Sequence, residues 1–377
     1  MKHNKLNRLI SFIALAGIIT AWFIGNWRYD NDNLNKLDEI FVESSSLELQ
    51  SENIYSFSKG ENTFYLSIGK AMGYEGPVSC AVVTDSSGKI CDVQVIEHTE
   101  TPSYFDKVVK LPEYFINQKV CSILNSEDIP DAISGATLTS VAICDAVYNV
   151  SERLAEKIFD LPIPEREKAH INISFLDIMI MVFFAGVLIT RKTKPKARKW
   201  IRYSMLILSV IILGFTYNFH LTISRFNALF LGYWPDINQY LAWYLLVFGL
   251  IILTIIIGKN TYCHWFCPFG AIQEGIGMIG KAKNRIPYKY NRRLTWFPRL
   301  LAWLAIVLAL IFKNPGIMSY EVFGKFFTLT GSDLLFVLML ITLGTSVFIK
   351  NAWCRYVCPV PPVVDYIIFW RQEVTAK

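Results

Sequence analysis

Residues 259–274 read KNTYCHWFCPFGAIQE, and residues 350–365 read KNAWCRYVCPVPPVVD. The two stretches share the pattern Lys-Asn-x-aromatic-Cys-x-aromatic-x-Cys-Pro, and their matching positions stand 91 residues apart. Two apolar segments separate equivalent positions, so the chain holds an internal repeat of two segments and one cysteine motif. A pseudo-two-fold axis along the membrane normal would bring the four sulfurs together. The cysteines are Cys263, Cys267, Cys354 and Cys358.

Four thiolates in two Cys-x3-Cys pairs suit a zinc ion or an iron–sulfur cluster. Proline directly after the second cysteine occurs in ferredoxin ligand runs, and the flanking aromatic rings exclude water, which tunes a redox centre. A cluster is therefore favoured over zinc, and a disulfide is disfavoured in a reducing cytoplasm. Four ligands predict one cluster. A second cluster would need further ligands, and His264 is the only histidine near either motif.

The composition around these motifs indicates a membrane protein. Of the 377 residues, 53% are hydrophobic and only 18% are charged, against roughly 25% charged in soluble domains. The mean hydropathy is +0.34. These values exclude a disordered chain, a collagen-like chain and a conventional soluble enzyme. Six apolar segments approach the roughly 20 residues that a membrane crossing needs: Leu9–Gly25, Ile173–Thr190, Tyr203–Phe219, Tyr240–Gly258, Trp296–Phe312 and Leu334–Ile349.

The charges are segregated along the chain. Residues 27–172 hold 24 acidic and 12 basic side chains, whereas residues 191–202 hold seven basic side chains and no acidic one. Residues 259–293 hold seven basic side chains and one acid, Glu274. The lysine and arginine asymmetry places both termini and these two basic connections in the cytoplasm, and the acidic segment outside it. The net charge of +6 therefore reflects topology and indicates no nucleic-acid partner.

The sequence thus predicts an α+β extracytoplasmic domain joined to an α-helical, multi-pass domain of the inner or plasma membrane. Residues 1–26 form an N-terminal anchor, which could alternatively be a cleaved signal peptide. Residues 27–172 form the external domain. Residues 173–377 form five further membrane helices with both cysteine motifs on the cytoplasmic side. The lipid bilayer is accordingly an expected partner.

Within the external domain, residues 77–98 read as a hairpin of two strands around the turn DSSG. Residues 105–117 and 140–159 read as helices, the second long and amphipathic. Between the helices lies DAISGATLTS, residues 131–140. Its glycine, hydroxyls and amides precede a helix, where a phosphate could be held. On the residues alone, an ordinary helix N-cap is the competing interpretation.

DAISGATLTS resembles the SGAT motif of the FMN-binding domains of the Rnf and Nqr complexes and of NosR-like proteins. The stretches GYEGP (73–77) and HTETP (98–102) resemble the same family. The resemblance implies FMN joined covalently through its phosphate to Thr137, and a dedicated flavin transferase, of the ApbE type, as a partner. It implies a cofactor-binding set that contains Asp131, Ser134, Gly135, Ala136, Thr137, Thr139, Glu100 and Thr101.

Other polar residues of this domain leave alternatives open. His98 and Glu100 could act as an acid–base pair, although lining the flavin pocket or capping a strand is favoured. Four further cysteines have no tight spacing, so buried free thiols and disulfides are both compatible with an external compartment. These are Cys80, Cys91, Cys121 and Cys144.

The cysteine motifs resemble the Cys-x3-Cys-Pro membrane proteins of the NosR and NapH type, which bind 4Fe-4S clusters. The first motif matches through Gly270 and Ala271, but the second departs with Pro361 and Pro362. The layout is similar to that of PceC-like membrane flavoproteins. The resemblance implies electron transfer from a cytoplasmic donor or membrane quinol, through 4Fe-4S and FMN, to an external reductase or other acceptor. A substrate-specific catalytic residue is not indicated. Alternatives are a NosR-like redox sensor or maturation factor and an ion-translocating subunit of the Rnf or Nqr kind.

Overall fold

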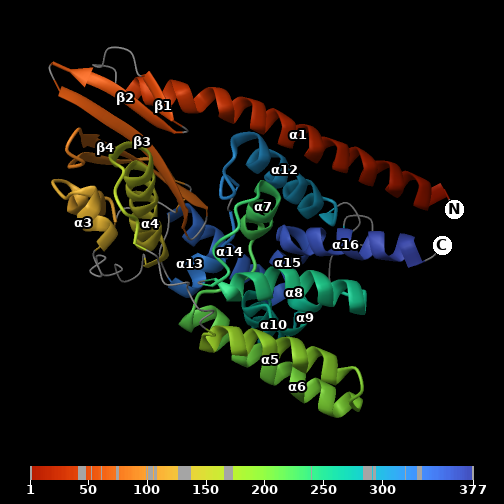
Figure 1. Ribbon diagram of the computed structural model, residues 1–377. Helices are drawn as coiled ribbons and strands as arrows, with labels where there is room; N and C mark the ends of the chain where they lie inside the picture. The colour runs from red at the N-terminus through yellow and green to blue at the C-terminus, as the bar shows by residue number, and fades with distance from the viewer. Residues whose placement is uncertain are drawn as a thin grey trace.

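The computed structural model contains a sheet-based part and a larger helical part (Figure 1). It describes residues 2–40, 48–51, 53–60, 62–73, 76–98, 100, 105, 108–125, 137–164, 173–238, 240–282, 291, 294–318, 320–328 and 333–375. The sheet part lies at one end of the helical part, and both chain termini lie at the opposite end. Tyr366 donates to the Ser11 carbonyl and Trp370 packs against Phe12, so the two terminal helices meet there.

An antiparallel five-stranded meander forms the sheet, in the order β1-β2-β3-β4-β5. The strands are β1 (Glu48–Ser51), β2 (Ile54–Lys59), β3 (Asn62–Met72), β4 (Pro77–Asp85) and β5 (Ile90–His98). α4 (Thr137–Leu154) continues into a π-helical turn over Ala155–Phe159 and packs on β3 and β4. Apolar residues of α4 such as Ile143 and Val147 share a buried core with Val82 of β4. The sheet and α4 confirm the α+β character predicted for this part, and three of the five strands were not predicted.

The predicted hairpin at residues 77–98 is confirmed by β4 and β5. Asp85 closes its turn by accepting hydrogen bonds from the amides of Ser87 at 2.8 Å and Lys89 at 2.9 Å. Gly88 takes a φ of +77° in this turn, a conformation that suits glycine because it has no Cβ. Burial alone would raise the pKa of Asp85, but the hydrogen bonds from Ser87 and Lys89 outweigh burial and lower that pKa.

The helix predicted over residues 105–117 is wrong in its described part. Residues 111–115 form a short 3-10 helix, Leu111–Phe115, with Pro112 in its first turn. Proline lacks the amide hydrogen that an extended α-helix would need. The amide of Asn117 instead donates to the Ile90 carbonyl at 2.9 Å, which ties the segment to β5. α3 (Val120–Asn125) follows.

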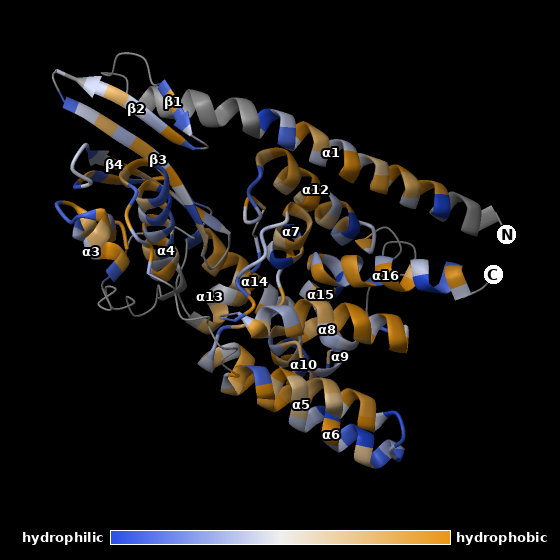
Figure 2. Cartoon of the chain, viewed as in Figure 1, coloured by the Kyte–Doolittle hydropathy of each residue, from blue (hydrophilic) through white to orange (hydrophobic). Residues whose placement is uncertain are grey.

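Each of the six predicted apolar segments is helical (Figure 2). They correspond to α1 (Lys2–Ile40), α5 (Phe175–Thr190), α6 (Pro195–Ser209) with its π-helical extension Val210–Thr216, α8 (Leu241–Ile257), α12 (Phe297–Phe312) and α14 (Asp333–Phe348). Among the described residues, Arg8–Arg28 and Pro195–Thr216 are long and apolar enough to cross a membrane. The other four helices are apolar but shorter. A crossing by all six stays a prediction, as do the domain boundaries.

Short helices complete the helical part. They are α7 (Ile223–Leu231), α9 (Thr261–Trp265), α10 (Pro268–Ile279), α13 (Phe323–Thr328), α15 (Ala352–Tyr356) and α16 (Val360–Thr375). The connections that precede α7 and α13 fold back among the long helices, which the sequence did not predict. The Leu221 amide donates to the Tyr262 hydroxyl at 2.8 Å, and the Tyr320 hydroxyl donates to the Val357 carbonyl at 3.0 Å. Both connections therefore reach the cysteine motifs.

The Asp85 turn generates a first prediction. Asp85→Ala should weaken the β4–β5 hairpin by about 1 kcal/mol, because two backbone amides lose their acceptor. Hydrogen–deuterium exchange should quicken across residues 86–98. Asp92→Ala removes a half-buried carboxylate that accepts from the Gln94 side chain on the same hairpin. As the matched control, it should leave exchange unchanged. Since the pKa of Asp85 is lowered, its contribution is present above an unfolded-state pKa of about 3.9 and is lost as the pH falls through the lower folded-state value. Unchanged exchange in Asp85→Ala would contradict this role.

Candidate flavin and iron–sulfur sites

The first cysteine motif is shaped by a sequence of helix caps. α8 ends at Gly258 in the left-handed conformation, with φ +72°. The Asn260 side chain then caps α9 by accepting from the Cys263 amide at 3.1 Å. Cys267 is the N-cap of α10, and its Sγ accepts from the Gly270 amide at 3.4 Å. Pro268 occupies the first turn, where its missing amide hydrogen costs nothing. The Cys-Pro pair therefore places one sulfur at a helix N-terminus.

The second motif repeats this plan with a different backbone. Cys354 lies in α15, and Cys358 lies two residues before the first residue of α16. The Val360 amide lies near the Cys358 sulfur, as the Gly270 amide lies near Cys267. Asn351, the counterpart of Asn260, has a φ of +51° and makes no capping hydrogen bond through its side chain. The two motifs share the Lys-Asn pair, but the backbone conformation at its asparagine differs between them.

The four motif thiols converge from the two halves of the helical part. Cys263 interacts electrostatically with Cys267 and Cys354, and Cys358 interacts with Cys354 and Cys263. Among the described residues, no three His, Cys, Asp or Glu side chains are close enough to hold a single metal ion. The thiols are therefore neighbours without forming a closed single-ion site. Their number, their convergence and the two helix N-termini are a donor set that fits an iron–sulfur cluster.

Burial governs the protonation of this site. Desolvation raises the pKa of all four thiols, to about 11 for Cys267, and neighbouring thiols raise it further for Cys263, Cys354 and Cys358. Such a raised pKa keeps the Cys267 thiol protonated near neutral pH. Thiolate ligation must release these protons, so metal loading is linked to pH.

The motifs lie inside the helical part, back from the end of α8. The Arg371 side chain of α16 donates to the Ile255 carbonyl near the end of α8. α16 runs alongside α8 from the interior to the C-terminus (Figure 1). Val360, the first residue of α16, is 11 residues before Arg371. Val360 therefore lies roughly 16 Å from Arg371 along the helix axis, whereas the whole of α8 is about 25 Å long. The cysteines therefore stand well within the bundle.

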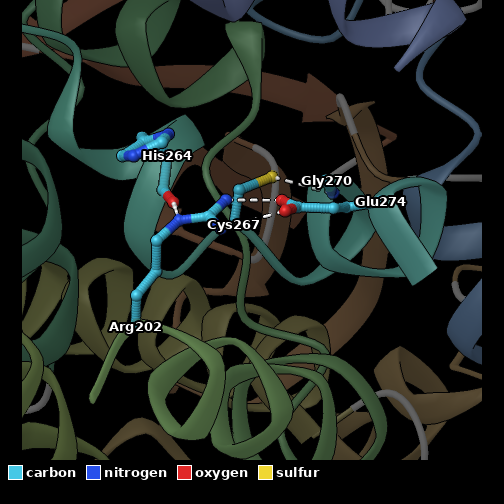
Figure 3. A network of polar contacts seen from close by, with 5 residues as sticks. All are labelled: Arg202, His264, Cys267, Gly270 and Glu274. Carbon is cyan, nitrogen blue, oxygen red and sulfur yellow. Dashed lines mark hydrogen bonds and ion pairs between the residues drawn. The ribbon is translucent and has the colours of Figure 1, made fainter. Parts of the chain in front are cut away.

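A buried ion pair holds the first motif against α6. Arg202 donates to both carboxylate oxygens of Glu274, at 2.9 and 2.5 Å, and to the His264 carbonyl at 3.0 Å (Figure 3). The two side chains are only 16% and 12% exposed. Burial alone would raise the pKa of Glu274, but hydrogen bonding and the charge of Arg202 outweigh burial and lower it. Since His264 lies between Cys263 and Cys267, this bidentate pair fixes the ligand loop.

The candidate flavin site lies at the sheet end of the helical part. The Thr139 hydroxyl donates to the Glu100 carboxylate at 2.9 Å, and both side chains are buried. A Cβ on Gly73 would overlap the Glu100 carboxylate, so a larger residue at position 73 would displace that side chain from its present place. Thr137 is the first residue of α4, the helix start predicted to hold a phosphate. The side chain of Thr137 lies outside the described part of the chain, as do Thr101, Asp131, Ser134, Gly135 and Ala136.

His98 and the cysteines of this domain differ in their surroundings. The His98 ring stacks on Phe105 with centroids 3.7 Å apart, and burial lowers the pKa of His98. This aromatic contact favours the pocket-lining interpretation of His98 over an acid–base role. Cys80 and Cys144 are buried neighbours in the core, and Cys91 is exposed. All the cysteines are free thiols in this structure.

The flavin site faces the helical part directly. Tyr240, which caps the start of α8, lies within electrostatic range of Asp145 and Glu100. Met72, next to Gly73, packs against the apolar core that contains Cys267 and Cys358. Packed side chains therefore connect the candidate flavin site to the core around the motif cysteines.

Sequence reasoning missed several polar groups around the cysteines. Arg202 and Glu274 come from segments 72 residues apart, and their only signal was one acid within a basic stretch. Gln273 lies between Cys354 and the Trp353 amide. Glu321 is 7% exposed and accepts from the Ile223 amide at 2.8 Å. It was overlooked because its segment was not expected to fold back among the helices.

Comparison with known families supports both cofactors. The model of the FMN-binding domain family matches residues 73–152, which include the SGAT motif. The model of a 4Fe-4S binding domain family matches residues 240–287 and 334–373, which include all four motif cysteines. The chain therefore carries an FMN-binding domain and a 4Fe-4S binding domain, and these domains support FMN and an iron–sulfur cluster as its cofactors.

Three similar proteins place these domains in context. The chain is 26% identical over 204 residues to protein NirI of Paracoccus denitrificans, across 49% of this chain and 29% of NirI. It is 29% identical over 147 residues to "Putative electron transport protein YccM" of Escherichia coli, across 35% and 40%. It is 32% identical over 112 residues to the regulatory protein NosR of Stutzerimonas stutzeri, across 27% and 15%. The chain spans less than half the length of each of these relatives.

The Arg202–Glu274 pair generates a second prediction. Arg202→Ala should lower stability by about 3 kcal/mol, because it leaves a mostly buried carboxylate without its cation. We expect a lower thermal unfolding midpoint in detergent and less iron per purified chain.

Arg198→Ala is the matched control, since Arg198 lies one turn earlier on α6, is exposed and donates to the backbone carbonyls of Thr190 and Arg191. The double variant Arg202→Ala/Glu274→Ala should recover part of the loss because no unpaired carboxylate remains. An Arg202→Ala protein with unchanged midpoint and iron content would remove this pair from the support of the ligand loop.

Proposed function

We propose that this NosR-like flavin and iron–sulfur protein conducts electrons across a membrane between a cluster within its helices and FMN at the sheet end. The position of the cysteines carries the proposal. Val360 lies roughly 16 Å back from the end of α8, which leaves on the order of 10 Å along the axis to the start of that helix. Tyr240 at that start is near Glu100 of the candidate flavin site. The chain therefore brings its two redox sites toward one another.

The proposed topology has six crossings, with the FMN domain outside the cytoplasm and both termini inside. The helices α1, α5, α6, α8, α12 and α14 provide the crossings. Both chain termini lie at one end of the molecule, opposite the sheet (Figure 1), as an even number of crossings requires. The acidic character of residues 27–172 and the basic residues 191–202 give the orientation.

Cys263, Cys267, Cys354 and Cys358 are the proposed ligands of one 4Fe-4S cluster. The N-termini of α10 and α16 stabilise negative charge on Cys267 and Cys358. When bound, the cluster and the flavin supply one-electron chemistry. The chain itself positions the sulfurs, excludes water and holds the proposed flavin phosphate at the N-terminus of α4.

At the flavin site, covalent attachment is proposed at Thr137. The Thr139 hydroxyl is already directed to Glu100, and its residue is 1% exposed, so Thr137 is favoured as the site of transfer. Asp131, Ser134, Gly135 and Ala136 are proposed to be recognised by the ApbE-type transferase, and Thr101 to line the site with Glu100. These roles follow from the resemblance of DAISGATLTS to the SGAT motif.

The proposed electron donor is a membrane quinol or a cytoplasmic reductant, and the proposed acceptor is an extracytoplasmic reductase. The name of YccM refers to electron transport, which supports an electron-transfer role. A lipid bilayer is required by the proposed topology.

Two alternatives have specific support. The name of NosR describes a regulatory protein, so a redox sensor or maturation role is one alternative. The other alternative is an ion-translocating subunit, and the observation behind it is that the Glu321 carboxylate is buried where its connection folds back against α7. Ion uptake by proteoliposomes during flavin reduction would support translocation, and its absence would support simple conduction.

Flavin attachment gives a third prediction. Thr137→Ala should abolish covalent flavin when the flavin transferase is co-expressed, because the accepting hydroxyl is removed. In-gel flavin fluorescence after denaturation is the measurement. Thr139→Ala is the control and should retain fluorescence, although loss of its buried hydrogen bond should destabilise the domain by about 1–2 kcal/mol. Fluorescence that persists in Thr137→Ala but disappears in Thr139→Ala would move the attachment site to Thr139.

The proposal that the four cysteines bind one cluster gives a fourth prediction. Replacing any one motif cysteine by alanine should remove most of the iron, because the four ligands belong to one cluster. Two separate clusters would instead leave about half the iron in Cys354→Ala. Iron and FMN analysis of the four single variants distinguishes these cases.

The same variants test the proposed function. Covalent FMN should remain in Cys354→Ala and should still be reduced by dithionite. Reduction of that FMN by a quinol or cytoplasmic donor should fall at least tenfold in reconstituted vesicles. A donor-driven rate equal to that of the wild type would show that electrons bypass the cluster. Cys121→Ala, in the sheet part, is the matched cysteine control.

A further inference from the structure

Gln273 of α10 is a completely buried amide between the two cysteine motifs. Its Nε2 group donates to the Cys354 sulfur at 3.2 Å. Its Oε1 atom accepts from the Trp353 amide at 3.1 Å and from the Ser346 hydroxyl at 3.4 Å. The exposed fraction of Gln273 is 0%. One side chain of the first half therefore contacts three residues of the second half.

The orientation of this amide is fixed by its neighbours. A backbone amide can only donate, so the oxygen of Gln273 must face the Trp353 N–H. The nitrogen then faces the Cys354 sulfur, and reversing the amide would set two donors against each other. A buried amide is costly without partners, and Gln273 has a partner on each side. The packing of α10 against the second motif therefore fixes the hydrogen bond from Gln273 to the Cys354 sulfur.

The repeat does not place a second glutamine at the matching position. The residue 91 positions after Gln273 is Val364, which is buried and carries no polar group. Cys263, the counterpart of Cys354, interacts instead with the Asn260 side chain of its own motif. The donation from Gln273 to Cys354 thus joins the two halves in a way that the repeat does not duplicate at that position.

We infer that Gln273 raises the reduction potential of the cluster by donating a hydrogen bond to the Cys354 ligand. The inference rests on the proposed assignment of the four cysteines as ligands. Adding one electron makes the cluster and its sulfurs more negative, so a donor to sulfur stabilises the reduced state more than the oxidised state. The amide keeps its protons, and no bond forms or breaks. Gln273 is accordingly a positioning residue that tunes the cluster.

The test is an anaerobic redox titration of the purified full-length protein, followed by electron paramagnetic resonance and iron analysis. Gln273→Leu removes both the donor and the acceptor. Gln273→Glu keeps an oxygen that can accept from Trp353 but replaces the donating nitrogen. Each variant should show a lower midpoint potential, with the reduced-to-oxidised ratio at a fixed potential falling about tenfold, or about 59 mV for a one-electron couple. Ser346→Ala, which removes a contact of Gln273 without touching sulfur, should keep the wild-type midpoint.

The outcomes separate the inference from the proposed ligand assignment. An unchanged midpoint in a cluster-loaded Gln273→Leu or Gln273→Glu protein would overturn the tuning role. Loss of iron from both variants would also overturn it, because Gln273 would then only hold the loop. If wild-type protein lacked a cluster signal, or if the cysteine variants kept their iron, the ligand assignment itself would fail. A shift in both variants with full iron content supports the inference.

Discussion

The convergence of four sulfurs, two buried and two half-buried, from two motifs 91 residues apart is the constraint on which the helical part depends. Thiols are poorly solvated there, and burial keeps them protonated until a metal centre displaces the protons. The surrounding structure offsets this cost with helix N-termini, the amide of Gln273 and the Arg202–Glu274 pair. The short helices α9, α10 and α15 and the start of α16 present the sulfurs, and α10 also presents Gln273 and Glu274.

The repeat is only approximately symmetric, and its departures lie next to the sulfurs. Asn260 caps a helix whereas Asn351 takes a positive φ without doing so. Gln273 is matched in the repeat by Val364. Equivalent backbones would place four sulfurs in nearly equivalent surroundings. The different partners instead make the surroundings of the two cysteine pairs unequal.

The parts that could be predicted from the sequence are those with local signals. The DSSG turn specified the β4–β5 hairpin, and the apolar segments specified the long helices. Pro112 was visible in the sequence, yet its effect on the helix predicted over residues 105–117 was underestimated. The Arg202–Glu274 and Gln273–Cys354 contacts join residues 72 and 81 positions apart. No local pattern encodes such pairs, because they depend on how the helices pack.

The order of the chain also has a consequence for synthesis. Arg202, Asn260, His264 and Glu274 all precede Cys354, so the supports of the first motif can form before the second motif is made. At about 5–20 residues per second, the 91 residues between equivalent cysteines take roughly 5–18 s to translate. Cys263 and Cys267 are therefore made several seconds before Cys354 and Cys358. A site that draws on both motifs is incomplete until α15 and the start of α16 have been synthesised.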